Sequence, residues 1–171
     1  MNLLEHFATV RAFVFDVDGV LTDNSLFINE DGQLLRTMNA RDGYAMQLAI
    51  KKGYPIAIIT GGRSEGVAKR LHGLGIKDVF SAVSDKLPVL EEWLARNAID
   101  LEDVLYMGDD MPDIPPMQRV GLPCAPHDAC PQVLRVARYV SALNGGKGCV
   151  RDVIEKTLTL QGDWGEGAVS G

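Results

Sequence analysis

The amino-acid sequence predicts an α/β fold: a Rossmann-like, doubly wound parallel sheet with helices on both faces. Apolar segments of strand length alternate with amphipathic segments of helix length along most of the 171 residues, which is typical of a parallel sheet covered by its crossover helices. One segment, residues 25–39, interrupts the alternation and predicts a small protruding β-hairpin. The length suits one domain with a single core, which we place at residues 1–161.

Six strands are expected, because six short apolar runs are bounded by polar or turn-forming residues. Three of these runs read as buried strands, and they end in Asp16, Thr60 and Asp109. Ligands of open parallel sheets bind beyond the carboxyl ends of the strands, so these three residues mark the expected site. The predicted strands are residues 11–16, 54–60, 78–80, 103–109, 120–126 and 139–143.

Five helices are expected between or after these strands. Ser64 is a suitable N-cap for one of them and Gly75 follows its end, while Pro88 falls in the first turn of the next. The predicted helices are residues 42–53, 64–75, 85–97, 128–137 and 149–161.

The hairpin at residues 25–39 is expected to turn at Asp31-Gly32. Both of its faces carry apolar side chains, with Phe27 and Leu35 on one face. A lone hairpin is marginally stable in water, and exposed apolar faces mark interaction sites. We therefore expect a contact between subunits, the alternative being that the hairpin folds back on its own domain. The opposite face carries Leu26, Ile28, Leu34 and Met38.

Composition excludes several classes of protein. The net charge of −6 and the lack of a Lys/Arg run argue against a nucleic-acid partner. No stretch of about 18 apolar residues is present, so no membrane span is expected, and the start of the chain does not resemble a secretory signal. Cys124, Cys130 and Cys149 have neither a CxxC pair nor zinc spacing, which predicts free thiols and a cytoplasmic protein. The glycine-rich end, residues 162–171, is expected to be disordered.

Asp16 and Asp18 follow the first buried strand, and Gly19 allows a sharp turn directly after them. Residues two apart in a strand point to the same side, so both carboxylates are expected at one edge of the sheet. Asp109 follows another buried strand in the stretch GDDMPD. Clustered carboxylates must take up protons or bind a cation, and hard oxygen ligands favour Mg²⁺. The alternative is a set of solvated loop aspartates, and Asp110 alone can serve as a helix cap.

Thr60, Gly61 and Gly62 end the strand IAIIT and precede a helix. Backbone N–H groups in such a turn can hold phosphate oxygens, and the Thr60 hydroxyl adds another donor. Lys86 lies near the start of a helix, an unfavourable position for a cation unless an anion compensates it. The alternatives are an ordinary strand–helix connection and a surface lysine.

The order of these segments resembles the four motifs of the haloacid dehalogenase superfamily of phosphotransferases: DVDGVLTD, ITGG, Lys86 and GDDMPD. The resemblance implies that Asp16 is a nucleophile forming an aspartyl-phosphate and that Asp18 is the general acid/base. It implies that Thr60 and Lys86 hold the phosphoryl group. Asp16, the backbone carbonyl of Asp18, and Asp109 would bind Mg²⁺.

Spacing indicates the capless subgroup of this superfamily. Only 43 residues separate Asp16 from Thr60, and 25 separate Thr60 from Lys86, which leaves no room for a cap domain. The stretches MNARDGYAMQL, VGLPCAPHDA and GGKGCVRDV are similar to the 3-deoxy-D-manno-octulosonate 8-phosphate phosphatases. This resemblance implies a homotetramer assembled through the hairpins, with the segment containing Lys147 closing a neighbour's site.

The substrate implied by this resemblance is a small phosphorylated sugar acid, with Gly61, Gly62, Arg63, Lys86 and Lys147 as substrate-binding residues. Arg63 favours the eight-carbon acid, and a nine-carbon sialic-type acid phosphate is the alternative. Two further readings remain open from the residues: a receiver that accepts phosphate on Asp without turnover, and a non-catalytic assembly module.

Overall fold

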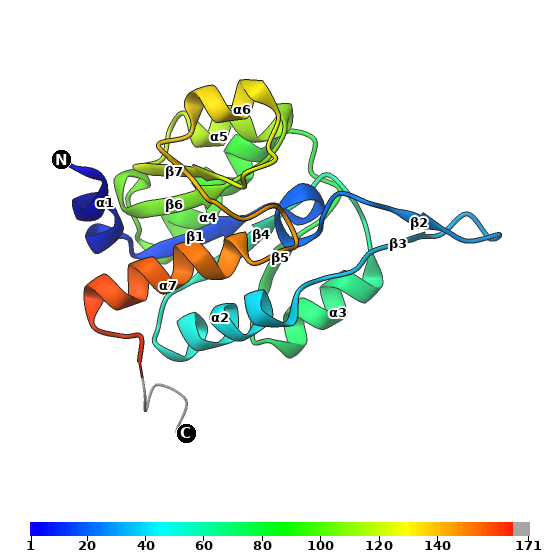
Figure 1. Ribbon diagram of the computed structural model, residues 1–171, viewed down its shortest axis with the longest axis horizontal. Coiled ribbons are helices and arrows are strands. Elements are labelled where there is room, and N and C mark those ends of the chain that lie inside the picture. The colour runs from blue at the N-terminus through cyan, green and yellow to red at the C-terminus, as the bar shows by residue number, and fades with distance from the viewer. Residues whose placement is uncertain (166–171) are drawn as a thin grey trace.

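The computed structural model describes residues 1–165 and confirms the predicted α/β fold. Its six-stranded sheet has the order β5-β4-β1-β6-β7-β8, and every neighbouring pair is parallel. Figure 1 shows helices on both faces of this sheet and the hairpin projecting from one end. No cap domain is inserted within residues 1–165. The strands are β1 (Ala12–Phe15), β4 (Ile56–Ile59), β5 (Asp78–Phe80), β6 (Val104–Met107), β7 (Leu122–Ala125) and β8 (Tyr139–Val140).

Strand β1 shows why the sheet is covered on both faces. Phe13 and Phe15 pack into the core on one face, whereas Ala12 and Val14 pack into the core on the other. All four side chains are fully buried. Burial of a side chain as large as Phe stabilises the fold by roughly 1.5–3 kcal/mol, so a continuously apolar strand is stable only between two covered faces.

The helices form two layers, one on each face of the sheet (Figure 1). All five predicted helices are present, and their ends differ from the predicted ones by at most three residues. No helix among residues 1–165 is long and apolar enough to cross a membrane. One layer contains α1 (Leu3–Thr9), α2 (Ala40–Lys51), α3 (Glu65–Gly73) and α7 (Cys149–Gln161). The other contains α4 (Lys86–Asn97), α5 (Ile114–Met117) and α6 (Pro131–Val136).

Helix α1 was not among the predicted elements, although its start carries a recognisable signal. Asn2 caps the helix by accepting a hydrogen bond from Glu5 N, and the Glu5 side chain accepts one from Asn2 N. This reciprocal capping box satisfies two backbone donors that a short helix would otherwise leave unpaired. Phe7 then anchors the helix edge-on to Tyr139, with ring centroids 5.2 Å apart.

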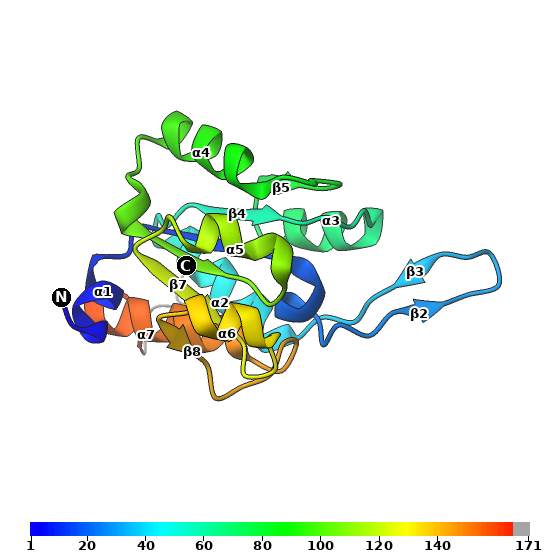
Figure 2. The same cartoon turned by 90° about the horizontal axis from the view of Figure 1, so that it is seen from above.

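The predicted hairpin is present, with Phe27 and Leu35 on one face as expected. Its strands β2 (Phe27–Ile28) and β3 (Leu34–Leu35) pair antiparallel, with Phe27 opposite Leu35 and Ile28 opposite Leu34. Phe27 is 68% exposed and Ile28 is 66% exposed. The hairpin therefore extends away from its own domain, as Figure 2 shows, and the alternative that it folds back is wrong.

The expectation of a disordered tail from residue 162 onward is wrong for its first residues. Asp163 Oδ2 accepts a hydrogen bond from the Tyr54 hydroxyl at 2.7 Å. Trp164 packs against the core, and the Arg151 guanidinium lies 5.1 Å from the centroid of its ring system. These aromatic and polar contacts hold the chain after α7, whereas residues 166–171 lie outside the described residues.

Candidate active site

Polar side chains from three strands meet at the carboxyl edge of the sheet. Asp16 follows β1, Thr60 follows β4, and Asp109 comes two residues after β6. Because β4 and β6 both pair with β1, their carboxyl ends lie side by side. A pocket of about 420 Å³ lies at these carboxyl ends. Its lining residues are Asp16, Asp18, Asn24, Thr60, Gly61, Gly62, Ala82, Val83, Ser84, Lys86, Asp109, Asp110 and Pro112.

Asp16 is fixed in place by the tight turn that follows β1. Its Oδ1 accepts a hydrogen bond from Val17 N at 2.7 Å, which caps the turn at Val17–Leu21. Within this turn Gly19 has φ +86°, a left-handed conformation that side chains other than glycine rarely adopt. The glycine also leaves space for another residue, because a Cβ atom at position 19 would overlap the Asp109 carboxylate.

Lys86 is the first residue of α4 and is only 3% exposed. Its Nζ lies 3.2 Å from Asp16 Oδ1 and 2.8 Å from Asp113 Oδ1. Burial alone would lower the pKa of Lys86, but the two carboxylates outweigh that effect and raise it. The lysine is therefore a charged group held in the pocket, and the alternative of a surface lysine is excluded.

Asp113 completes the arrangement, although the sequence did not single it out as a site residue. It is fully buried, and each carboxylate oxygen accepts two hydrogen bonds. Four donors satisfy a carboxylate completely, so Asp113 serves to position its neighbours rather than to bind a ligand. The sequence offered little to separate it from Asp109 and Asp110. The four donors are Lys86 Nζ and the Tyr106 hydroxyl on Oδ1, and Asp109 N and Asp110 N on Oδ2.

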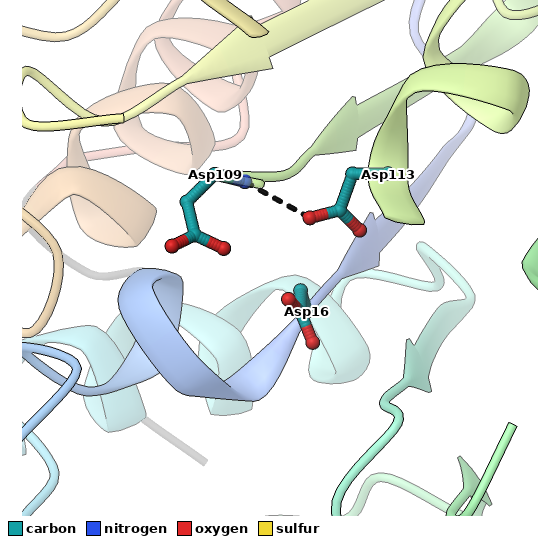
Figure 3. Close-up of side chains that lie close together, drawn as sticks. All are labelled: Asp16, Asp109 and Asp113. Atoms are coloured by element: carbon teal, nitrogen blue, oxygen red, sulfur yellow. Dashed lines mark hydrogen bonds between the residues drawn. The ribbon is translucent and has the colours of Figure 1, made fainter. Parts of the chain in front are cut away.

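Figure 3 shows the carboxylates of Asp16, Asp109 and Asp113 gathered at one place. One oxygen from each lies within 4.8 Å of the others. Burial and the charge of Asp113 raise the pKa of Asp16 to about 7, and burial and the charge of Asp16 raise the pKa of Asp109 to about 8. Within residues 1–165, these three carboxylates face one cation, the ammonium of Lys86, so the cluster lacks positive charge.

A divalent cation fits this deficit. Asp16 and Asp109 offer hard carboxylate oxygens from two neighbouring strands, the ligand type that Mg²⁺ prefers. The Asp18 side chain is held by Arg36, and the resemblance to the family implies the Asp18 backbone carbonyl as a third ligand. The side chains of Asp16 and Asp109, together with the Asp18 carbonyl, would hold the ion.

Asp18 lines the pocket and is bound by a residue of the hairpin. Arg36 Nε donates to Asp18 Oδ1 at 2.7 Å, and Arg36 Nη2 donates to Asp18 Oδ2 at 3.2 Å. The hydrogen bonds that Arg36 donates to the Asp18 carboxylate raise the pKa of Arg36. Arg36 carries no motif in the sequence, because an arginine in a hairpin resembles any polar surface residue.

Thr60 also lines the pocket and is 6% exposed. Its Oγ1 accepts a hydrogen bond from Gly62 N at 3.2 Å, which leaves the hydroxyl proton available to a ligand. Thr60, Gly61 and Gly62 therefore form the predicted donor-rich turn, and all three line the pocket.

Sequence and structure comparisons identify relatives over nearly the whole chain. A model of the haloacid dehalogenase-like hydrolase family matches residues 72–154. The 3-deoxy-D-manno-octulosonate 8-phosphate phosphatase of Yersinia pestis is 39% identical over 160 residues, which cover 94% of this chain and 86% of that protein. This chain belongs to the haloacid dehalogenase-like hydrolase family. The predicted superfamily and the predicted phosphatase class of enzyme are thereby confirmed.

Solved structures show the same fold as this hydrolase. The crystal structure of the Yersinia pestis phosphatase has a TM-score of 0.91 at 38% identity, covering 94% of this chain and 86% of that one. The phosphatase of Moraxella catarrhalis, solved with a magnesium ion, a phosphate ion and a KDO molecule, has a TM-score of 0.90 at 31% identity. That alignment covers 94% of this chain and 92% of the other. The Mg²⁺ predicted from clustered carboxylates is thus a cofactor found in this family.

Two predicted substrate-binding residues of the hydrolase lie outside the pocket. Arg63 is exposed beside Gly62 and lines a small neighbouring cavity, together with Arg36. The Lys147 side chain is 64% exposed, and its Nζ lies 3.9 Å from Asp23 Oδ2. The glycines before Lys147 pack against their own domain, because Gly146 N donates to Val20 O at 3.0 Å.

Proposed function

We propose that this hydrolase releases phosphate from 3-deoxy-D-manno-octulosonate 8-phosphate through an aspartyl-phosphate on Asp16. The observation that carries the proposal is the convergence of Asp16, Lys86 and Asp109 in one pocket beside the donor-rich turn at Thr60. Similarity along 94% of the chain to a phosphatase of that substrate supports the choice of sugar. So does the relative solved with phosphate and KDO.

The contacts suggest how each residue would act. Val17 N and Lys86 Nζ both approach Asp16 Oδ1, which orients Oδ2 for attack on phosphorus. The Thr60 hydroxyl and the Gly61 N–H would bind the phosphoryl oxygens, while the Gly62 N–H orients Thr60 through its hydrogen bond to Oγ1. Asp18 would protonate the departing alkoxide and later accept a proton from the attacking water. Mg²⁺, when bound, would offset the repulsion between the carboxylate and the phosphate.

A panel of sugar phosphates tests the substrate. Phosphate should be released from the eight-carbon acid phosphate much faster than from unrelated phosphomonoesters. A nine-carbon sialic-type acid phosphate is included as the competing substrate. Similar rates across the panel would reject the assignment of a specific sugar acid, whereas a preference for the nine-carbon compound would reassign it.

Replacement of Asp16 tests the nucleophile. Asp16→Asn should abolish turnover with Mg²⁺ while the circular dichroism spectrum is unchanged. Asp100→Asn, an exposed aspartate ahead of the opposite end of β6, is the matched control and should keep wild-type turnover. Substantial activity in Asp16→Asn would remove Asp16 from this role. A single turnover by the wild type would favour a receiver that accepts phosphate on Asp. The absence of any turnover would favour a non-catalytic assembly module.

The exposed hairpin supports a proposed homotetramer. Phe27, Ile28 and Leu35 present apolar surface on both of its faces, and such surface is costly to leave in water. Arg63 and Lys147 would then bind the substrate carboxylate from the rim, Lys147 in the site of a neighbouring subunit. Phe27→Ser with Leu35→Ser should yield monomers in sedimentation experiments.

We also propose a cytoplasmic location, because Cys124 and Cys149 are buried free thiols.

A further inference from the structure

The hairpin is physically connected to the pocket through Arg36. This residue directly follows β3, at the base of the hairpin, and its side chain is only 5% exposed. The guanidinium binds both oxygens of Asp18, at 2.7 Å and 3.2 Å. A paired geometry of this kind orients a carboxylate more strictly than a single contact does.

One further hydrogen bond fixes the guanidinium, and Gly62 lies beside it. Arg36 Nη1 donates to Leu34 O at 3.2 Å, so the side chain is tied to the backbone of β3. On the other side, a Cβ atom at position 62 would lie 3.0 Å from Arg36 Nη2 and 3.3 Å from Asp18 Oδ2. The Arg36–Asp18 pair thus lies against Gly62, in the turn that would bind the phosphoryl group.

We infer that Arg36 is a positioning residue for Asp18, through which the base of the hairpin sets the location of the general acid/base. The inference rests on the proposed function, because it assigns a partner to Asp18 within that reaction. Arg36 lines the cavity next to the pocket rather than the pocket itself, so it acts through Asp18 and does not contact the substrate.

This role has a kinetic signature. Cleavage of an alkyl phosphate requires protonation of a poor leaving group, whereas p-nitrophenolate leaves without a proton. Hydrolysis of the aspartyl-phosphate needs Asp18 as a base with either substrate. A variant with misplaced Asp18 should therefore still be phosphorylated by p-nitrophenyl phosphate but should release the phosphoryl group slowly.

The test measures both substrates with Arg36→Ala and Arg36→Lys. In Arg36→Ala we expect kcat for the sugar phosphate to fall by about 10- to 100-fold, a part of the usual contribution of general acid–base catalysis. With p-nitrophenyl phosphate, a burst of one p-nitrophenolate per site should precede a slow steady state. The inhibition constant of inorganic phosphate should change by less than about twofold, because Thr60 and Lys86, which would bind the phosphoryl group, are unchanged in this variant. Arg36→Lys should restore part of kcat.

A double-mutant cycle with Asp18→Asn separates positioning from general damage. If Arg36 acts only through Asp18, adding Arg36→Ala to Asp18→Asn should cause no further loss of kcat. Arg11→Ala is the matched control, because Arg11 also pairs with an aspartate, Asp103, before the opposite end of β1. It should keep wild-type kcat and show no burst.

Several results would overturn the inference: wild-type kcat in Arg36→Ala, equal losses on both substrates without a burst, or additive losses in the double variant. Melting temperatures are measured for each variant, and Arg36→Lys decides the question if Arg36→Ala fails to fold. Absence of turnover in the wild type itself would instead overturn the proposed function.

Discussion

The carboxylate of Asp109 occupies the space beside Gly19 that a side chain at position 19 would fill. Gly19 belongs to the turn after β1 and Asp109 to the loop after β6, so two motifs 90 residues apart meet without any room between them. The close approach places the Asp109 carboxylate near that of Asp16, so that both could coordinate one cation.

Gly19→Ala should lower the free energy of unfolding by more than backbone strain alone explains, because the added Cβ would overlap the Asp109 carboxylate. Gly53 provides the control, because its φ of +90° is similar to the +86° of Gly19 but nothing lies within 4 Å of the added Cβ. Gly53→Ala should cost about 1–3 kcal/mol, the usual cost of a strained backbone conformation. Gly19→Ala should cost more and should also weaken Mg²⁺ binding, as measured by urea unfolding and by titration calorimetry. Equal effects of the two variants would contradict the close packing described.

Asp113 should be important for stability as well as for the site. Asp113→Ala would leave the Lys86 ammonium without its 2.8 Å partner and the backbone N–H groups of Asp109 and Asp110 unpaired. Loss of one partner of a buried pair costs about 3–5 kcal/mol. Asp113→Asn keeps one acceptor oxygen and should cost less. Urea unfolding at pH 7 measures both, and a loss below about 1 kcal/mol for Asp113→Ala would refute the buried role.

Mg²⁺ should stabilise the folded protein, because the carboxylates of Asp16 and Asp109 repel each other without it. At an ion concentration of about 100 times Kd, binding to the folded state alone adds roughly 2.7 kcal/mol to the free energy of unfolding. The melting temperature should rise with Mg²⁺ and fall again with EDTA. Asp109→Asn should greatly reduce this shift. A wild-type melting temperature that does not respond to Mg²⁺ would count against a cation site.

Asp42 should make stability depend on pH. It lies in the first turn of α2 and is 1% exposed. Its Oδ1 accepts a hydrogen bond from Arg151 N, while its Oδ2 has no hydrogen-bond partner among the described residues 1–165. Burial raises the pKa of Asp42 to about 6 from its ordinary value of 3.8. The folded state thus holds this proton more tightly than the unfolded state does.

The sign follows from proton linkage. The contribution of Asp42 to the free energy of unfolding is fully present below pH 3.8 and is lost as the pH rises through about 6. The total loss is about 2–3 kcal/mol. Asp42→Asn removes this titration, so the variant should gain stability relative to the wild type as the pH rises from 4 to 7. Urea unfolding across this range measures the difference, and a constant difference would refute the prediction.

Much of the fold followed from local pattern. The continuously apolar strand that ends at Asp16 can be stable only inside a covered sheet, and the alternation of strands and helices leaves few other arrangements. The faces of the hairpin were predictable from alternation, because Phe27 and Leu35 were placed on one face and lie opposite each other. The loop is longer than the predicted Asp31-Gly32 turn: Asn29 N donates to Gln33 O, and Gly32 N donates to Asn29 O. Helix α1 was missed although its capping box is visible in the sequence.

The site was only partly predictable. Asp16, Thr60 and Asp109 were identified because each follows a buried strand, which is a property of the sequence near that residue. Asp113 and Arg36 were missed, because their importance depends on burial and on partners from other elements. Nothing local distinguishes a fully satisfied buried aspartate from one that caps a turn.

The sequence by itself determined the α/β class, the order of the motifs and the acidic character of the sheet edge, since these depend on residue type and spacing. Only the tertiary structure decided which carboxylates lie together at this edge and which of them pair with Lys86 or with Arg36. It also decided that Arg63 and Lys147 lie outside the pocket. The physical reason is that charge pairing and burial act through space, over distances of a few ångströms between residues far apart along the chain.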